Sequence, residues 1–252
     1  MRNGKRRSFM WWGYRIGEGK QPSPIKFNIE SHCHFLLVGG SGSGKSYALL
    51  YIVGKILQEY PDIDLTIIDF KNEDWCFLQG YKKAYFGNDA PAGILSYYEK
   101  FCNDRQAGNR GQRHLLIADE YPSMILYLSN RDKLEKTKKA VEIQNAIGEI
   151  LMLGRGIGFG VGIICQRSDA AWFPNGSRDN FHILTALGRI STEQKTMLFA
   201  GETLNNKVFQ RGEGVVLGDG YPVTEVKFPK ISNVVDWKKH IREVLLNQQN
   251  KQ

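Results

Sequence analysis

Long apolar runs and paired cysteines are both missing from this 252-residue chain. No apolar stretch approaches the ~20 residues that a membrane-spanning helix needs, so we expect no transmembrane segment. Residues 1–7 are basic, but Gly13 and Arg15 interrupt the apolar part that follows, which argues against a secretory signal peptide. The four cysteines show no Cys-x-x-Cys spacing, which disfavours a zinc site or a redox dithiol. We therefore expect a cytoplasmic protein that reaches any membrane complex only through a partner.

Internal repeats and low-complexity segments are absent as well, and the charges are not balanced. The chain has 34 Lys and Arg against 26 Asp and Glu, a net charge of +8. This excess favours a polyanionic partner, although a basic surface that only confers solubility explains it equally well. The 42% hydrophobic and 24% charged residues are ordinary for a chain that buries a core. The length suits one large α/β domain or two small ones.

The strongest signal is a glycine-rich stretch between a strand and a helix. Phe35–Val38 are apolar and run into Gly39-x-x-x-x-Gly44-Lys45-Ser46, after which Tyr47–Val53 read as a helix. This is the P-loop motif in the context it requires. Its glycines let the backbone wrap closely around phosphates, and the helix adds its positive N-terminal end. The predicted nucleotide-binding residues are Gly39, Gly40, Ser41, Gly42, Ser43, Gly44, Lys45, Ser46 and Tyr47.

A second apolar run ends in two adjacent acids, Asp119 and Glu120. Downstream of a P-loop, Asp119 is expected to hold Mg²⁺ through water, with the Ser46 hydroxyl as a direct ligand. Lys45 would reach the β- and γ-phosphates of ATP. Glu120 is placed to orient and deprotonate an attacking water. A P-loop kinase would not need this second acid, so the pair predicts ATP hydrolysis by water.

Two other buried strands end in polar residues. Leu65–Ile68 closes with Asp69, at the edge where α/β folds bind ligands. Asp69 could bind a metal-bound water or order the next loop, or it could merely cap the next turn, and the residues leave these alternatives open. Val161–Cys165 ends at Gln166, which can donate to phosphate or water as a γ-phosphate sensor.

The remaining pattern predicts strands at 14–17, 25–29 and 181–187 and a hairpin over 214–228. It predicts helices at 47–60, 94–102, 141–153, 192–209 and 234–246, the third burying a face that includes Leu153. Residues 103–113 read as a polar connecting loop. We divide the chain into a basic and aromatic arm (1–13), a motor domain (14–231) and a C-terminal helix with a polar tail (232–252).

Two small features near the N-terminus have alternative interpretations. The pair Trp11–Trp12 is expected to anchor the arm, either on the domain or on a membrane partner. His32 and His34 flank Cys33, but strand alternation would place the histidines on one face and the thiol on the other. We therefore favour structural roles over a metal site.

A charge run covers Ser129–Lys139, with five basic residues against two acidic. It lacks a sustained apolar face, so it is predicted to be a mobile loop. Such a loop is either merely solvated or makes contact with nucleic acid.

Taken together, these motifs resemble the FtsK/SpoIIIE branch of the FtsK–HerA P-loop motors over residues 14–228. The segments that carry the resemblance are Phe35–Ser46, Ile67–Lys71, Leu116–Glu120, Ile150–Gly158, Ile163–Ser168 and Asn180–Ser191. The resemblance implies a RecA-like α/β fold with a mainly parallel sheet, a short β lead-in and a C-terminal hairpin plus helix. It also implies a hexameric ring that binds ATP between subunits and threads DNA through its pore.

The same resemblance suggests further site residues. Arg155 and Arg189 match arginines that the family retains, and either could reach a neighbour's γ-phosphate or form a structural ion pair. The charge run stands where the family has pore-facing segments, so it is a candidate for DNA contact. The candidate contacts are Arg131, Lys133, Lys136, Lys138 and Lys139.

Two departures from the family pattern matter. The chain lacks the membrane spans, linker and winged helix of the large chromosome pumps, which suggests a minimal motor for a plasmid, phage or other mobile element. Targeting would come from partner proteins. Ser168 also replaces the proline that usually follows Gln-Arg. The alternatives are a protein-translocating secretion ATPase of the same superfamily and a nucleotide-regulated DNA-binding scaffold.

Overall fold

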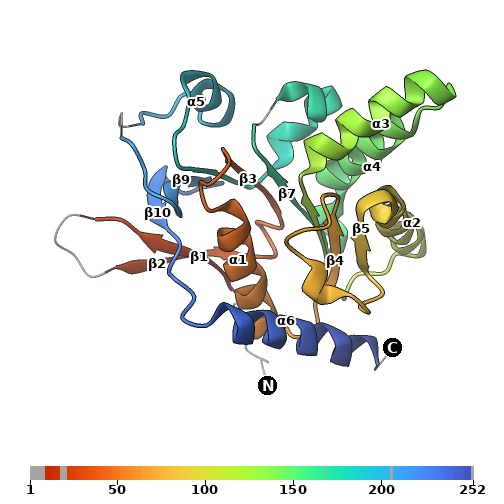
Figure 1. Cartoon of the computed structure of the whole chain (residues 1–252), viewed down its shortest axis with the longest axis horizontal. Coiled ribbons are helices and arrows are strands. Elements are labelled where there is room, and N and C mark those ends of the chain that lie inside the picture. The colour runs from red at the N-terminus through yellow and green to blue at the C-terminus, as the bar shows by residue number, and fades with distance from the viewer. Residues whose placement is uncertain (1–8, 18–21, 168, 205–206, 251–252) are drawn as a thin grey trace.

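The computed structural model describes residues 9–17, 22–167, 169–204 and 207–250, which form a ten-stranded sheet flanked by helices (Figure 1). The strand order is β2-β1-β10-β9-β8-β3-β7-β6-β4-β5. Residues 1–8 of the predicted arm and Ser168 lie outside the described residues. The strands are β1 (Phe9–Arg15), β2 (Ser23–Asn28), β3 (His34–Gly39), β4 (Asp64–Asp69), β5 (Ala84–Phe86), β6 (His114–Asp119), β7 (Phe159–Cys165), β8 (Ile183–Leu187), β9 (Glu213–Gly218) and β10 (Thr224–Lys227).

The strands from β8 to β5 run parallel, so their carboxyl ends meet at one edge of the sheet. The other four strands continue the sheet in antiparallel pairs. This arrangement confirms the predicted α/β class with a mainly parallel sheet, a β lead-in and a C-terminal hairpin. It also gathers the P-loop and the ends of β4, β6 and β7 along a single edge.

Six helices cover the two faces of the sheet. They are α1 (Lys45–Glu59), α2 (Ala90–Ala107), α3 (Tyr121–Glu135), α4 (Lys139–Leu153), α5 (Thr192–Leu198) and α6 (Val234–Gln249). Short 3₁₀ segments are η1 (Cys76–Leu78), η2 (Gly87–Asp89), η3 (Gly154–Ile157), η4 (Ala170–Trp172) and η5 (Pro174–Asn180). None of the helices that the structure describes is long and apolar enough to span a membrane.

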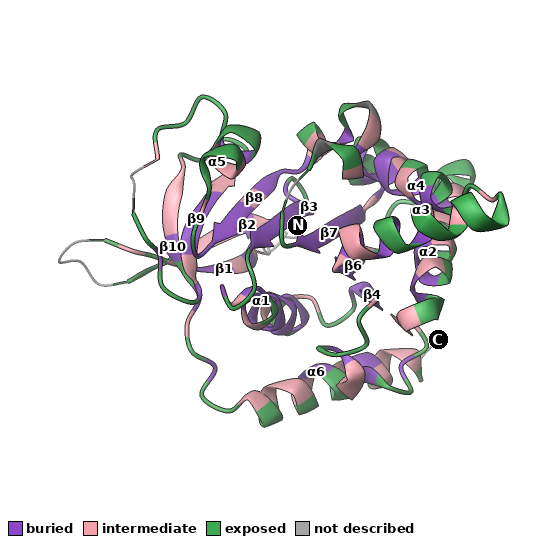
Figure 2. Ribbon diagram, turned by 45° about the horizontal axis from the view of Figure 1, so that its top comes forward, coloured by how far each residue is buried: buried purple, intermediate pink, exposed green. Residues whose placement is uncertain are grey.

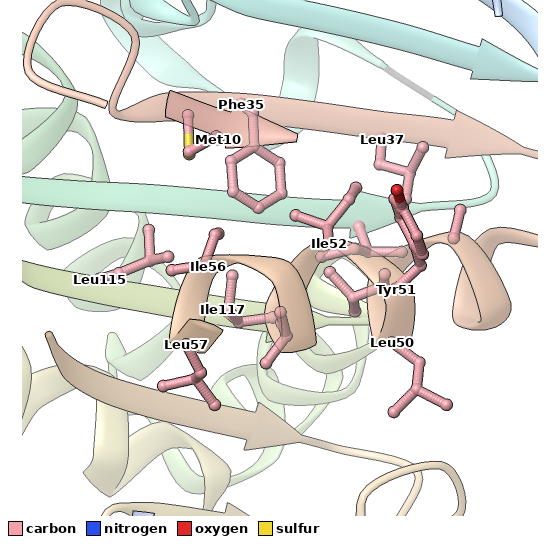
Figure 3. Close-up of a cluster of buried hydrophobic side chains, with 14 of the residues drawn as sticks. Met10, Phe35, Leu37, Leu50, Tyr51, Ile52, Ile56, Leu57, Leu115 and Ile117 are labelled. Carbon is pink, nitrogen blue, oxygen red and sulfur yellow. The ribbon is translucent and has the colours of Figure 1, made fainter. Parts of the chain in front are cut away.

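The core consists of two apolar layers, one on each side of the sheet. One layer packs α1 and α6 against the sheet, and the other packs α2, α3 and α4. Figure 3 shows Phe35 and Leu37 of β3 opposite Ile52 and Ile56 of α1, all fully buried. The central strands are buried throughout, whereas the helices expose their outer faces (Figure 2). The carboxyl edge of β3 is thus held in place by tight packing behind it.

The prediction of a mobile loop over 129–139 is wrong, because most of this segment is helical. α3 continues to Glu135 and ends at Lys136 in a left-handed turn, φ 55°, and α4 begins at Lys139. The buried apolar residues of α3 lie in its first half, and polar contacts stabilise its second half. Asp132 accepts hydrogen bonds from the backbone N–H groups of Lys139 (3.0 Å) and Ala140 (2.8 Å), which joins the two helices.

Three other boundaries differ from the predictions. α2 extends to Ala107 and ends at Gly108 with φ 70°, so only the second half of the expected 103–113 loop is a loop. The helix expected over 192–209 covers only Thr192–Leu198. Leu153 is 42% exposed rather than buried, because α4 ends there and turns away from the core.

The tryptophan pair packs on the domain, as one of its two interpretations expects. Trp12 lies in β1, is fully buried, and donates from its indole Nε1 to Thr185 Oγ1 at 2.8 Å. The Trp11 indole donates to Glu59 of α1. The division that we drew after residue 13 therefore falls inside a strand that extends to Arg15.

His34, Cys33 and His182 form a buried cluster whose ligand atoms lie within 4.8 Å of one another. The Nδ1 atom of His34 accepts from the Val161 N–H, and that of His182 accepts from the His34 N–H, both at 3.1 Å. Burial lowers the pKa of His34 to about 3 and of His182 to about 4, so both rings are neutral at pH 7. A neutral ring that accepts at Nδ1 has its proton on Nε2, so His34 offers no free nitrogen to a metal in this arrangement. We therefore keep the structural interpretation of the cluster.

Candidate nucleotide site

The P-loop follows β3 and is shaped by its glycines. Gly42 and Gly44 have φ values of 78° and 97°, a region that side chains strain to adopt. A Cβ on Gly39 would lie 2.5 Å from the Ser43 Oγ and 2.8 Å from the Leu187 carbonyl oxygen. The loop therefore has a fixed curvature that presents backbone N–H groups to a phosphate.

Lys45 is positioned inside this loop. Its side chain is largely buried, and its Nζ donates to the carbonyl oxygens of Gly39 (2.6 Å) and Gly40 (3.2 Å). Burial lowers the pKa of Lys45, while the carboxylates of Glu120 and Asp119 oppose that shift. The ammonium therefore lies between the loop and the acids, where bound phosphates would meet it.

One cavity brings together most of the residues predicted from separate motifs. It is lined by the P-loop and by the side chains of Asp69, Lys71, Glu73, Asp74, Asp119, Glu120, Gln166 and Arg211. These residues come from the carboxyl ends of β4, β6 and β7 and from the loop before β9. Lys45, Ser46, Asp119, Glu120 and Gln166 thus meet as the sequence predicts.

Asp119 is a buried carboxylate, 5% exposed, and no ion pair in the described part of the chain involves it. Burial, together with the negative charges of Asp74, Glu120 and Asp69, raises its pKa to about 7. A buried carboxyl group that forms no ion pair is suited to a cation. Together with the nearby Ser46 hydroxyl, it offers the oxygen ligands that Mg²⁺ prefers. The residues therefore fit a magnesium–nucleotide site.

Glu120 is held at the start of α3 by three polar contacts. Its backbone is in the left-handed region, φ 54°. Lys71 Nζ lies 2.8 Å from Oε1, Gln166 Nε2 donates to the same oxygen at 3.3 Å, and Ser123 Oγ donates to Oε2 at 3.2 Å. Burial alone would raise the pKa of Glu120, but the hydrogen bonds and charge of Lys71 outweigh burial and hold it below its ordinary value. The carboxylate is therefore ionised and aimed into the cavity.

Asp69 orders the loop after β4. Its carboxylate accepts from the N–H groups of Asn72 (2.9 Å), Glu73 (3.0 Å) and Trp75 (2.9 Å). Of the alternatives predicted for Asp69, the structure shows the hydrogen bonds that cap the turn and order the loop. Within that loop, Asp74 accepts a hydrogen bond from Ser46 Oγ at 2.6 Å.

The comparisons with known proteins agree with this geometry. No family model matches the chain. It is 27% identical over 239 residues to the FtsK domain-containing protein YdcQ of Bacillus subtilis (strain 168), a match that covers 88% of this chain and 48% of YdcQ. The chain is thus similar to an FtsK domain-containing protein. It spans about half the length of that curated relative.

Two solved structures share the fold of this chain. EssC (ATPases 2 and 3) from Geobacillus thermodenitrificans matches with a TM-score of 0.72 and 13% identity, over 97% of this chain and 49% of EssC. The pCW3 conjugation coupling protein TcpA, solved as a monomer form with ATPγS, also has a TM-score of 0.72, with 17% identity over 97% of this chain and 71% of TcpA. The predicted RecA-like fold is thus confirmed.

The two candidate trans arginines lie at opposite edges of the sheet. Arg155 is in η3, before β7, and its guanidinium lies 3.4 Å from His182 Nε2. Arg189 follows β8 on the P-loop edge, where Gly188 lies against Ser43. Neither side chain lines the nucleotide cavity of its own chain. A role in trans stays a prediction for both.

The candidate DNA contacts lie at the far end of the helical hairpin that α3 and α4 form (Figure 1). Arg131 and Lys139 are ion-paired with Glu135. Lys133, Lys136 and Lys138 are exposed, and none of the ion pairs among the described residues uses them. Their contact with DNA stays a prediction, now on a rigid hairpin instead of a loop.

Four cavity residues are missing from the sequence-based site, namely Lys71, Glu73, Asp74 and Arg211. Lys71 and Asp74 closely follow a strand that ends at the ligand edge, and that position could have indicated them. Arg211 precedes Gly212, whose N–H donates to the Ser43 carbonyl oxygen at 2.8 Å. That contact joins segments far apart in the chain and leaves no local sequence signal.

Proposed function

We propose that this chain binds ATP with Mg²⁺ in the P-loop cavity and hydrolyses the nucleotide with water. The observation that carries the proposal is the convergence of Lys45, Asp119, Glu120 and Gln166, from three separate segments, on one cavity. Phosphoryl transfer to water requires a phosphate-binding loop surrounded by a lysine ammonium, a buried carboxylate, an ionised carboxylate and an amide.

Each group has a definite role in this proposal. Bound Mg²⁺ would neutralise developing phosphate charge, held by Ser46 directly and by Asp119 through water. Glu120 takes a proton from water as the water oxygen bonds to the γ-phosphorus and the bond to the β–γ bridging oxygen breaks, which releases ADP. Gln166 donates to Glu120 at 3.3 Å and is within the same cavity, where it can orient the water or the γ-phosphate.

Substitution of the proposed base tests the mechanism. Glu120→Gln should bind ATP normally and lower kcat by about 10²–10⁴-fold, the usual contribution of a general base. Lys45→Ala should instead lose nucleotide binding. Binding measured with a fluorescent nucleotide and turnover measured by phosphate release separate the two effects. An unaltered kcat in Glu120→Gln would contradict the assignment.

We further propose that hydrolysis drives DNA through a ring of subunits, a hexamer by resemblance, in the cytoplasm of a cell that carries a mobile element. The similarity to an FtsK domain-containing protein and to a conjugation coupling protein supports this cargo. The unpaired lysines on the α3–α4 hairpin offer charge for phosphate contacts, which would be independent of base sequence. Element-specific proteins would select the DNA.

DNA-stimulated hydrolysis distinguishes this function from its alternatives. ATP turnover should rise with added DNA and the stimulation should fall with salt, with a smaller salt slope when Lys133, Lys136 and Lys138 are changed together to Gln. Hydrolysis without stimulation would favour a protein cargo. DNA binding without displacement of a triplex strand would favour a nucleotide-regulated scaffold.

A further inference from the structure

The loop that follows β4 brings an additional carboxylate to the P-loop serine. Ser46 Oγ donates to Asp74 Oδ2 at 2.6 Å, and both side chains line the cavity that contains Asp119. A hydroxyl has one proton and two lone pairs. Because the proton is directed at Asp74, the lone pairs of Ser46 remain available to a cation. The contact therefore orients the serine for ligation without blocking it.

Asp74 is held in place from both sides. Asp69 anchors the preceding backbone through the N–H groups of Asn72 and Glu73, and the following backbone through that of Trp75. Trp75 itself is only 1% exposed and belongs to the core layer under α1. The side chain of Asp74 is solvent-exposed, yet its backbone is fixed by these anchors. The fold thus presents this carboxylate to Ser46 instead of leaving it on a free loop.

Asp119 provides an independent indication that a cation belongs here. Its carboxylate is buried and stands outside every ion pair of the residues that the structure describes, although it faces the same cavity. Burial of a carboxylate without a partner is costly, and a bound cation would remove that cost. The ion would lie between Asp119 and Ser46, with Asp74 behind the serine.

We propose that Asp74 is a positioning residue that holds the Ser46 hydroxyl in the orientation that ligates Mg²⁺. The inference rests on the proposed binding of ATP with Mg²⁺ and adds a residue that acts only through the serine. Partners of metal ligands orient those ligands, and their loss commonly lowers metal affinity by about 10–100-fold. Asp74 needs no bond of its own to the ion.

The effect of Mg²⁺ on nucleotide affinity measures this role without requiring hydrolysis. The Kd of a fluorescent ADP analogue would be determined in excess Mg²⁺ and in EDTA, and their ratio isolates the contribution of the ion. Asp74→Ala should reduce that ratio by about 10-fold or more, with little change in EDTA. Asp74→Asn should retain most of it, because the amide oxygen can still accept from Ser46.

Two comparisons make the test specific. Asp62→Asn also removes an exposed carboxylate, but one outside the cavity, and it leaves the Ser46 contact intact, so it should keep the wild-type ratio. In a Ser46→Ala background, Asp74→Ala should add no further loss, because the two residues act as a unit. Asp74 is exposed, so the variants should unfold at wild-type temperatures.

The outcomes also separate this inference from the proposed function. A wild-type protein that binds no nucleotide in either buffer would overturn the proposed function. A wild-type protein that binds with a large Mg²⁺ effect, while Asp74→Ala keeps that effect, would overturn only the role of Asp74. Equal losses in Asp74→Ala and Asp62→Asn, or additive losses with Ser46→Ala, would also overturn it.

Discussion

At the scale of single residues, the site is controlled by which charges are paired and which are not. Glu120 forms an ion pair with Lys71, whereas Asp119 is buried near other acids and forms no ion pair among the described residues. The two adjacent carboxylates therefore have opposite pKa shifts, one below and one above its ordinary value. Such divergence is how neighbouring acids acquire different roles. Here it separates an ionised base from a carboxylate that needs a cation.

Removal of Lys71 should change the pH dependence of hydrolysis. The Lys71 ammonium lowers the pKa of Glu120, so Lys71→Met should raise that pKa and move the acid limb of kcat upward by about one pH unit. The profile would be measured at saturating Mg²⁺ and ATP. Lys71→Arg keeps the charge and should keep the limb in place. Lys100→Met, which removes a similar ion pair elsewhere, should not move it either. A fall in kcat with an unmoved limb would show that Lys71 does not act through Glu120.

Asp119 should make the metal-free protein less stable as pH rises. Its folded pKa is about 7, above the value of roughly 3.9 in an unfolded chain, so the folded state binds the proton more tightly. The contribution of Asp119 to the free energy of unfolding is therefore greatest below about pH 4, and it declines as pH rises towards 7. In EDTA, Asp119→Asn should raise the Tm at pH 8 and have a smaller effect at pH 5. An unchanged or lower Tm of Asp119→Asn at pH 8 would indicate that burial of the ionised Asp119 carboxylate does not destabilise the folded protein.

At the scale of elements, apolar strands and their ends were predictable, and tertiary contacts were not. β3, β4, β6 and β7 are short apolar runs that end in Gly, Asp or Gln, and this pattern located the ligand edge. The 129–139 segment reads as a loop in the sequence because it has no apolar stripe. Ion pairs stabilise the end of α3 instead, and Asp132 accepts a hydrogen bond from the start of α4. Asp74 reaches Ser46 only because Asp69 folds the intervening loop.

The packing of α6 on α1 depends on a glycine within a helix. A Cβ on Gly54 would lie 2.4 Å from the Trp237 ring, whose indole Nε1 donates to the Leu50 carbonyl oxygen at 2.9 Å. Gly54→Ala should therefore destabilise the protein by about 1–3 kcal/mol, the usual cost of overpacking, although alanine favours helix. In a Trp237→Ala background the same substitution should stabilise by up to about 1 kcal/mol. Denaturant unfolding of the four proteins gives both values, and destabilisation in both backgrounds would exclude this explanation.

At the scale of the whole molecule, the candidate nucleotide cavity of the described residues contains acids, two lysines, an amide and one arginine. That arginine is Arg211, which lies at the P-loop with its Cγ 3.3 Å from where a Cβ on Gly44 would be. Arg155 and Arg189 do not line this cavity. If the proposed ring forms, we expect one of these two to complete the site of a neighbouring subunit.

Mixed rings should identify that arginine. Lys45→Ala and Arg189→Ala would each be inactive alone if Arg189 acts in trans. In a random one-to-one mixture, about a quarter of the interfaces would pair an intact P-loop with an intact Arg189, and activity should return in proportion. Phosphate release by the mixture is the measurement, and the same experiment with Arg155→Ala tests the other candidate. Arg211→Ala is the matched control, because Arg211 and Lys45 serve the same chain's site, so their variants should not complement. Recovery with Arg211→Ala, or no recovery with either trans candidate, would contradict a site shared between subunits.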